Sequence, residues 1–133
     1  MAAQNLGLNT CWVAFCARKK SKAVCGEGQK VRIVISVGYG KIAGHERPTK
    51  SIEQLSTVEG SQPAPSWFAC AMEAVQLAPT AMNNQHFTFT LRADGRTVAA
   101  KAPSGTWDTV DLGIAKCHFV LIADELNVDW AWE

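Results

Sequence analysis

The sequence lacks the short signatures that mark several enzyme classes. It contains no Walker loop, no Gly-x-Gly-x-x-Gly segment and no nucleophile elbow. Its histidines stand at positions 45, 86 and 118, and none has a useful spacing from a pair of carboxylates. A structural or partly exposed role is the simpler interpretation of such histidines. The sequence therefore gives no support to hydrolytic or metal-dependent chemistry.

An excess of charge and a long apolar run are also missing. The 13 basic and 12 acidic residues give a net charge of +1, so no overall field favours nucleic acid or anionic lipid. No apolar run is long enough to span a bilayer. The basic cluster at 18–22 is short, and a solvated helix face explains it more simply than a phosphate-binding patch. The sequence predicts neither a nucleic-acid partner nor a membrane.

Cysteine usage indicates a reducing compartment. The five cysteines, at 11, 16, 25, 70 and 117, are odd in number, and no signal peptide precedes them. Free thiols in a cytoplasmic protein are the simplest interpretation. Cys11 and Cys16 have no second pair that would complete a zinc site, so no metal is predicted. A thiol-based redox protein would rest on the cysteine count alone, because the chain has no Cys-x-x-Cys pair.

The first half of the chain predicts short and irregular elements. Its residues 1–6 are typical of the end of a helix with Gly7 as its cap, and 19–25 can form a short helix. The continuous, β-branched apolar run at 31–37 predicts a buried strand. A polar loop follows over 41–50. A helical turn at 51–55 precedes a linker rich in Ser, Gly and Pro, over 56–66.

The second half is more strongly patterned. A helix is expected over 67–78, capped by Ser66, with Phe68, Met72 and Val75 on its buried face. Clean alternation predicts a strand over 86–92, a turn at Asp94-Gly95 and a partner strand over 96–102. A helix over 106–123 follows. We expect its buried face to carry the residues Val110, Ile114, Cys117 and Leu121. The fold class is α+β with an antiparallel element.

A partial internal repeat suggests how the chain is organised. Segments 6–11 and 112–117 share the pattern Leu-Gly-aliphatic-x-x-Cys, although six positions also allow coincidence. If the repeat is real, residues 1–55 are the back half of a first module and residues 67–133 the front half of a second. The linker 56–66 divides them. We therefore expect a partial segment of a longer tandem protein.

One loop combines features that suit a ligand. After the predicted helix stop at Pro79, small and amide side chains run up to the aromatic strand. Such a loop offers donors and acceptors beside an apolar wall, which suits a flat heteroaromatic ligand with a polar edge. Alternatively, the amides only cap the helix end and turn the chain. The residues alone leave both interpretations open.

Three segments of the chain resemble FMN-dependent nitroreductases. Residues 78–85, Ala-Pro-Thr-Ala-Met-Asn-Asn-Gln, are similar to that family's Ala-Pro-Ser-x-x-Asn-x-Gln-Pro-Trp segment. Residues 6–13 resemble its mid-chain Leu-Gly-Leu-Gly-x-Cys-Trp-Ile segment, and 31–40 with 47–55 resemble its closing strand, turn and basic tail. The rotated order of these segments, together with 111–119, resembles the tandem subgroup called putative TM nitroreductases. The resemblance implies a nitroreductase-like α+β fold present as a partial tandem module.

The resemblance also implies roles for individual residues. In the family, the segment after Leu-Gly-x-x-x-Cys lies near the reactive flavin nitrogen, the Pro-Ser-x-x-Asn segment reaches the flavin across a subunit boundary, and the basic tail holds the phosphate. The implied FMN-binding residues are therefore Trp12, Val13 and Ala14, then Pro79, Thr80, Ala81 and Asn83 with Gln85 behind them, and finally Arg47 and Lys50. Two departures are that His86 stands where the family usually has proline, and that no Arg-rich N-terminal phosphate motif is found in this chain.

The implied activity is that of an FMN-dependent oxidoreductase of the nitroreductase type. FMN would pass hydride from NAD(P)H to nitroaromatic or quinone-like acceptors, which fits a chain without an evident side-chain acid or base. The alternative is a non-catalytic flavin binder or a degenerate structural module. Because each half-module lacks its complement and exposes apolar faces, we expect a homo-oligomer rather than a bare monomer.

Overall fold

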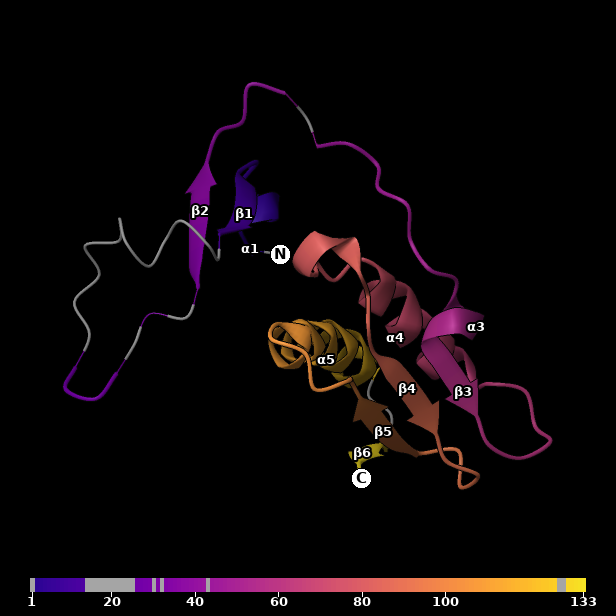
Figure 1. The fold of residues 1–133 in the computed structure, drawn as a ribbon. Helices are drawn as coiled ribbons and strands as arrows, with labels where there is room; N and C mark the ends of the chain where they lie inside the picture. Colours follow the sequence, from indigo (N-terminus) through magenta and orange to yellow (C-terminus); the bar gives the residue numbers. More distant parts are fainter. Residues whose placement is uncertain (1, 14–25, 30, 32, 43, 127–128) are drawn as a thin grey trace. The chain divides into compact units, whose positions relative to one another are not determined.

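A computed structural model describes residues 2–13, 26–29, 31, 33–42, 44–126 and 129–133. The chain divides into two compact units, Met1–Arg47 and Pro48–Glu133 (Figure 1). The division falls before the helical turn at Ile52–Leu55, whereas the sequence suggested a linker over 56–66. The assignment of the two stretches to halves of tandem modules stays a prediction.

The first unit is a small helix followed by a two-stranded sheet. Helix α1 (Ala2–Asn5) confirms the predicted helix, and Gly7, with φ of +70°, ends it by donating its N–H to the carbonyl of Gln4. Strand β1 (Asn9–Val13) pairs antiparallel with β2 (Val34–Gly38), so that Trp12 lies opposite Ile35. The sequence did not indicate β1, and the helix expected over 19–25 lies outside the described residues.

Strand β2 corrects one expectation. The strand itself was predicted, but most of it is exposed rather than buried, with Val37 58% exposed. The continuous apolar run predicted a buried strand, because such runs are typical of strands with both faces covered. Strand β2 instead belongs to a sheet of only two strands, and its apolar side chains remain accessible to solvent.

The second unit is built on a four-stranded sheet with the order β3-β4-β5-β6. Its strands are β3 (Ser56–Val58), β4 (Thr88–Leu91), β5 (Thr97–Lys101) and β6 (Ala131–Trp132). The predicted hairpin is confirmed, because β4 and β5 pair antiparallel around a turn in which Asp94 accepts hydrogen bonds from the N–H groups of Arg96 and Thr97. Strands β3 and β6 add to its two sides as parallel neighbours.

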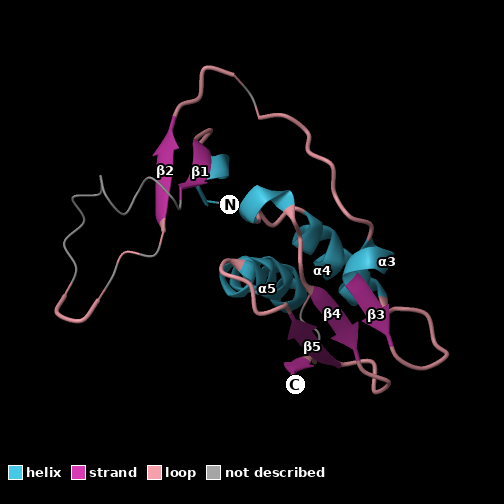
Figure 2. Ribbon diagram, viewed as in Figure 1, coloured by secondary structure: helices cyan, strands magenta, loops and turns pink. Residues whose placement is uncertain are grey.

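Helices cover one face of this sheet (Figure 2). They are α3 (Ile52–Leu55), α4 (Ser66–Gln76) and α5 (Asp108–Glu125), and the short 3₁₀ turn η1 (Ala81–Asn83) follows α4. Helices α4 and α5 pack against each other, and the buried residues between helices and sheet form one core. The predicted inward-facing residues of α4 and of the strand expected over 86–92 are confirmed in this core: Phe68, Met72, Val75, Phe87, Phe89 and Leu91.

Two helix details differ from the sequence-based expectation. Ser66 is the first residue of α4 rather than its cap, and Pro65 occupies the cap position. On α5 the buried residues are Asp111, Ala115, Phe119 and Ala123, whereas Cys117 and Leu121 are exposed. This helix has apolar residues all round, so its sequence gives no clear phase, and packing against α4 and β5 selects the buried face.

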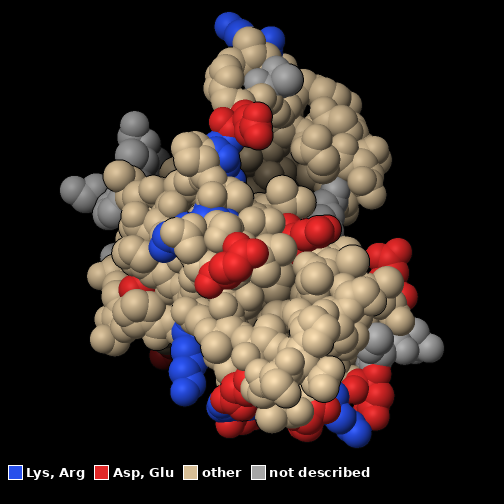
Figure 3. Space-filling model, turned by 90° about the vertical axis from the view of Figure 1, so that its right-hand side faces the viewer, with Lys and Arg blue, Asp and Glu red and all other residues tan. Residues whose placement is uncertain are grey.

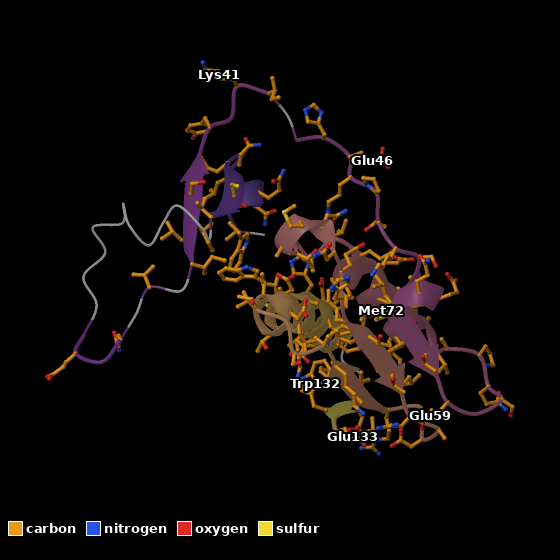
Figure 4. All side chains as sticks on the ribbon, in the orientation of Figure 1. Lys41, Glu46, Glu59, Met72, Trp132 and Glu133 are labelled. Carbon is orange, nitrogen blue, oxygen red and sulfur yellow. The ribbon has the colours of Figure 1, made fainter. Side chains whose placement is uncertain are left out.

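The end of the chain closes the sheet with aromatic and ionic contacts. The ring of Trp132 lies 5.4 Å from that of Phe119 on α5, and the Lys116 ammonium sits 4.1 Å above the Trp132 ring. Arg92, after β4, forms ion pairs with both Glu59 and Glu133, which lie close together in Figure 4. These contacts join the segments after β3 and β6 to the central hairpin.

Candidate functional site

The loop after α4 has an unusual backbone. Helix α4 ends before Pro79, because the residue preceding a proline is disfavoured in a helical conformation. Met82, Asn83 and Gln85 then adopt positive φ values of 53°, 55° and 47°. Non-glycine residues rarely adopt this left-handed region, and such strain persists only where surrounding contacts impose it. The loop that the sequence suggested for ligand binding is therefore a tightly specified structure.

Two side chains hold the start of this loop. The hydroxyl of Thr80 accepts a hydrogen bond from the backbone N–H of Gln85 at 3.2 Å, which closes the loop on itself. The carboxylate of Asp111 on α5 accepts the N–H of Ala81, with its two oxygens 3.1 and 3.0 Å from that nitrogen. The sequence did not indicate a role for Asp111 itself, although the residue opens the family-like segment 111–119.

Gln85 is the buried centre of the loop. It is 2% exposed, and its side-chain oxygen accepts the N–H of Lys50 at 2.8 Å. Its amide nitrogen donates to the Thr49 hydroxyl at 3.0 Å and to the Gln76 carbonyl at 3.3 Å. The amide thus joins the end of α4, the loop and the segment before α3. Its polar atoms are occupied by protein groups, as a buried amide requires.

The structure brings two of the predicted site segments together. The side-chain nitrogen of Asn83 donates to the carbonyl of Pro48 at 2.7 Å, and the Lys50 ammonium donates to the carbonyl of Gln85 at 3.0 Å. The basic tail and the amide-rich loop, more than thirty residues apart in sequence, therefore share one surface of the second unit. Pro79, Thr80 and Ala81 lie at the start of the same loop.

A cavity of about 400 Å³ opens beside this junction. It is lined by Lys50, Gln54, Gln85, His86, Phe87, Thr88, Lys101, Ala102 and Pro103. Two ammonium groups and a histidine line it and no carboxylate does, which suits an anionic ligand. Asp108 lies 3.7 Å from His86, just outside the lining. On the molecular face seen in Figure 3, basic and acidic side chains are interspersed.

Lys101 was not indicated by the sequence-based reasoning. It ends β5 directly opposite Thr88, the first residue of β4. The predicted hairpin contained the signal, since counting back along both strands from Asp94-Gly95 places residue 101 near the loop that ends at His86. A lysine at this position becomes significant only once Lys50 is known to line the same cavity.

The remaining predicted residues belong to the first unit. Trp12 and Val13 lie on β1, where Trp12 is 37% exposed. Ala14 lies outside the described residues. Arg47 is the last residue of this unit and is half-buried. His118, by contrast, has a structural position, because its Nδ1 lies 3.0 Å from the carbonyl of Ala74 and ties α5 to α4.

The surroundings of Asp111 shift its pKa. Burial raises the pKa of Asp111, as does the neighbouring charge of Asp108, while the hydrogen bond from Ala81 and the charge of His86 act in the opposite direction.

Across the described ranges, no set of three or more His, Cys, Asp or Glu side chains is arranged to hold a metal ion. No helix among these residues has the length and apolar character needed to cross a membrane.

Comparison with known proteins decides the family. A sequence model described as putative TM nitroreductase matches residues 1–123. The chain belongs to this family. A solved structure agrees: the crystal structure of a putative nitroreductase from Thermotoga maritima superposes with a TM-score of 0.67 and 26% identity, over 91% of this chain and 48% of that one. No curated protein matches.

These findings confirm the resemblance and the fold class. This nitroreductase-family chain has a mixed helix-and-sheet structure with a nitroreductase fold, as the three short segments indicated. It spans about half the length of the solved nitroreductase that it matches, in agreement with the expected partial module. The family is one of oxidoreductases.

Proposed function

We propose that this nitroreductase-family chain acts as an FMN-dependent oxidoreductase that passes hydride from NAD(P)H to nitroaromatic or quinone-like acceptors. Bound FMN would supply the redox chemistry, and the protein would bind, orient and cover it. The observation that carries the proposal is the meeting of the basic tail and the amide-rich loop, through the contacts Asn83 to Pro48 and Lys50 to Gln85. In the family resemblance these two segments both serve the flavin.

The cavity beside the loop is the proposed binding site for the phosphate group of FMN. Lys50 and Lys101 line it without an opposing carboxylate, and its volume lies in the range of small-ligand sites. An ammonium group can move within its side-chain reach and form a charge-assisted hydrogen bond with phosphate. Arg47, in the same tail as Lys50, is the second basic candidate that the family pattern implies.

The flavin ring would use groups beyond this cavity. Pro79, Thr80, Ala81 and Asn83 offer backbone and amide groups on the strained loop, and in the family pattern Trp12, Val13 and Ala14 approach the reactive nitrogen. We assign Gln85 a supporting role, because its amide holds Lys50, Thr49 and Gln76 in place. The proposal therefore places Gln85 behind the site rather than against the cofactor.

A non-catalytic flavin-binding or structural module is the second candidate. It is favoured because two amide side chains of the loop bind protein groups: Asn83 contacts Pro48, and Gln85 has three partners. Such contacts are sufficient reasons for amides in a loop. The two candidates differ in turnover and not in fold.

Turnover separates the two candidates. Purified chain loaded with FMN should oxidise NADH or NADPH faster than free FMN does when a nitrofuran is the acceptor, and Lys50→Ala should reduce that rate. Lys41→Ala is the matched control, because Lys41 is an exposed lysine of the first unit (Figure 4). Tight flavin binding without turnover above free FMN would favour the non-catalytic module.

We also propose a cytoplasmic location and a homo-oligomeric state for the protein. A cytoplasmic location would suit the thiols of Cys11, Cys70 and Cys117, which are free in the structure. A homo-oligomer would cover exposed apolar side chains such as Leu77, which is 71% exposed.

A further inference from the structure

Asp111 is a buried acidic residue whose carboxylate contacts the backbone of another segment. It lies in the first turn of α5 and is 5% exposed. Both of its carboxylate oxygens point to a single donor, the N–H of Ala81, thirty residues earlier in the sequence. The side chain therefore links α5 to the first residue of η1 rather than to its own helix.

Burial makes a carboxylate costly at this position. Burying a charge is unfavourable unless hydrogen bonds compensate, and here burial is the main cause that raises the pKa of Asp111. Asp108 adds like charge on the same helix, and His86 supplies an opposing charge only when it is protonated. An apolar residue would avoid this cost but would remove the acceptor of the Ala81 N–H, so the contact with Ala81 is the feature to explain.

The residues that follow Ala81 give the explanation. Met82 and Asn83 are held at φ of 53° and 55°, although Met82 is 87% exposed and gains little from packing. A side chain with a Cβ atom does not favour this conformation, whereas glycine adopts it readily. The fixed amide of Ala81 directly precedes the left-handed pair, and Asn83 then reaches Pro48.

We propose that Asp111 is a positioning residue for the cofactor site: its carboxylate fixes Ala81 and so imposes the left-handed turn that sets Asn83 against the tail. This inference rests on the proposed function, because the positioned loop is the one assigned to FMN. Asp111 touches the loop and not the cofactor. Removing its acceptor should free the turn, and a glycine inside the turn should restore it.

Three variants test this role through FMN affinity. Asp111→Ala removes the acceptor and should weaken FMN binding by about tenfold or more. Asp111→Asn keeps one acceptor oxygen and should remain within about threefold of the parent. Adding Met82→Gly to Asp111→Ala should recover most of the lost affinity, because glycine adopts the positive φ without the steric cost of a Cβ atom. A residue needed only for core packing would not be rescued by a change at an exposed loop position.

Amide exchange of Ala81 gives a readout without flavin. The Ala81 N–H should exchange slowly in the parent and in Asp111→Asn, and faster in Asp111→Ala. If Asp111→Ala does not fold, the Asn variant still decides: a rapidly exchanging Ala81 amide with unchanged FMN affinity would overturn the proposal. Equal affinity losses in the Ala and Asn variants, with no recovery from Met82→Gly, would overturn it as well.

Failure of the proposed function would look different. A folded parent that binds no FMN would contradict the assigned cofactor, and with it the cofactor role of the turn. Slow exchange of Ala81 that depends on Asp111 would then support the positioning of the turn alone. Exchange that is the same in all variants would show that Asp111 does not set the turn.

Discussion

Replacing Gln85 with Leu should release the tail and the amide-rich loop from each other. Leucine has a similar size and no branch at Cβ, so the volume and backbone demands at φ of 47° change little. The change removes three hydrogen bonds, to Lys50, Thr49 and Gln76. At about 1 kcal/mol each, their loss lowers the free energy of unfolding by roughly 3 kcal/mol.

Urea denaturation followed by tryptophan fluorescence measures this loss. Gln62→Leu is the matched control, because Gln62 is an exposed glutamine in the loop after β3, and its substitution should change stability by less than about 0.5 kcal/mol. If Gln85→Leu unfolds at the same urea concentration as the parent, the amide does not hold the two segments together, and the description of the site is wrong.

Four further predictions concern the second unit and the thiols. Because the pKa of Asp111 is raised above 3.8, the stability of the parent relative to Asp111→Asn should fall as the pH rises from about 3.8 through that pKa. Asp94, whose pKa is lowered to about 2 by hydrogen bonds from Thr97, should show the opposite trend: the parent loses stability relative to Asp94→Asn as the pH falls from 3.8 to 2, and equal pH profiles in urea melts would contradict both. Trp132→Ala should lower the free energy of unfolding by about 2–3 kcal/mol, since it removes the ring contacts of β6, and an unchanged melting temperature would show that β6 is dispensable. Thiol titration of denatured, unreduced protein should find all five cysteines, and a shortfall of two would indicate a disulfide.

Local periodicity explains what could be predicted. The strand with Phe87, Phe89 and Leu91 alternates strictly, and the turn at Asp94-Gly95 has a sequence that specifies its geometry. Both patterns depend only on residues that are close together in the sequence, so the hairpin can be predicted from the sequence alone. The helix that precedes it is fixed in the same way, by an apolar face and by Pro79.

Two of the missed strands, β3 and β6, depend on distant partners. Ser56–Val58 lies in a stretch rich in Ser, Gly and Pro and becomes β3 only by pairing with β4. Ala131–Trp132 becomes β6 through pairing with β5 and through ring contacts with α5. Strands of two or three residues have no measurable alternation of their own, so the tertiary fold determines them.

The same distinction applies to the site. Lys50, Thr80, Asn83 and Gln85 could be named because short family-like segments contain them. Their mutual contacts could not, since a hydrogen bond from Asn83 to Pro48 crosses 35 positions. Asp111 and Lys101 gain their significance from a buried contact and from a shared cavity, which only the folded chain provides.

The central claim, that this chain holds FMN by its phosphate and ring, is tested most directly by comparing the affinities of FMN and riboflavin. Titration into the purified chain, followed by quenching of flavin fluorescence, measures both. A charge-assisted phosphate contact predicts that FMN binds at least about tenfold more tightly than riboflavin, and that Lys50→Ala combined with Lys101→Ala narrows the difference. Equal affinities for the two flavins in the parent, or no binding of either, would contradict the claim.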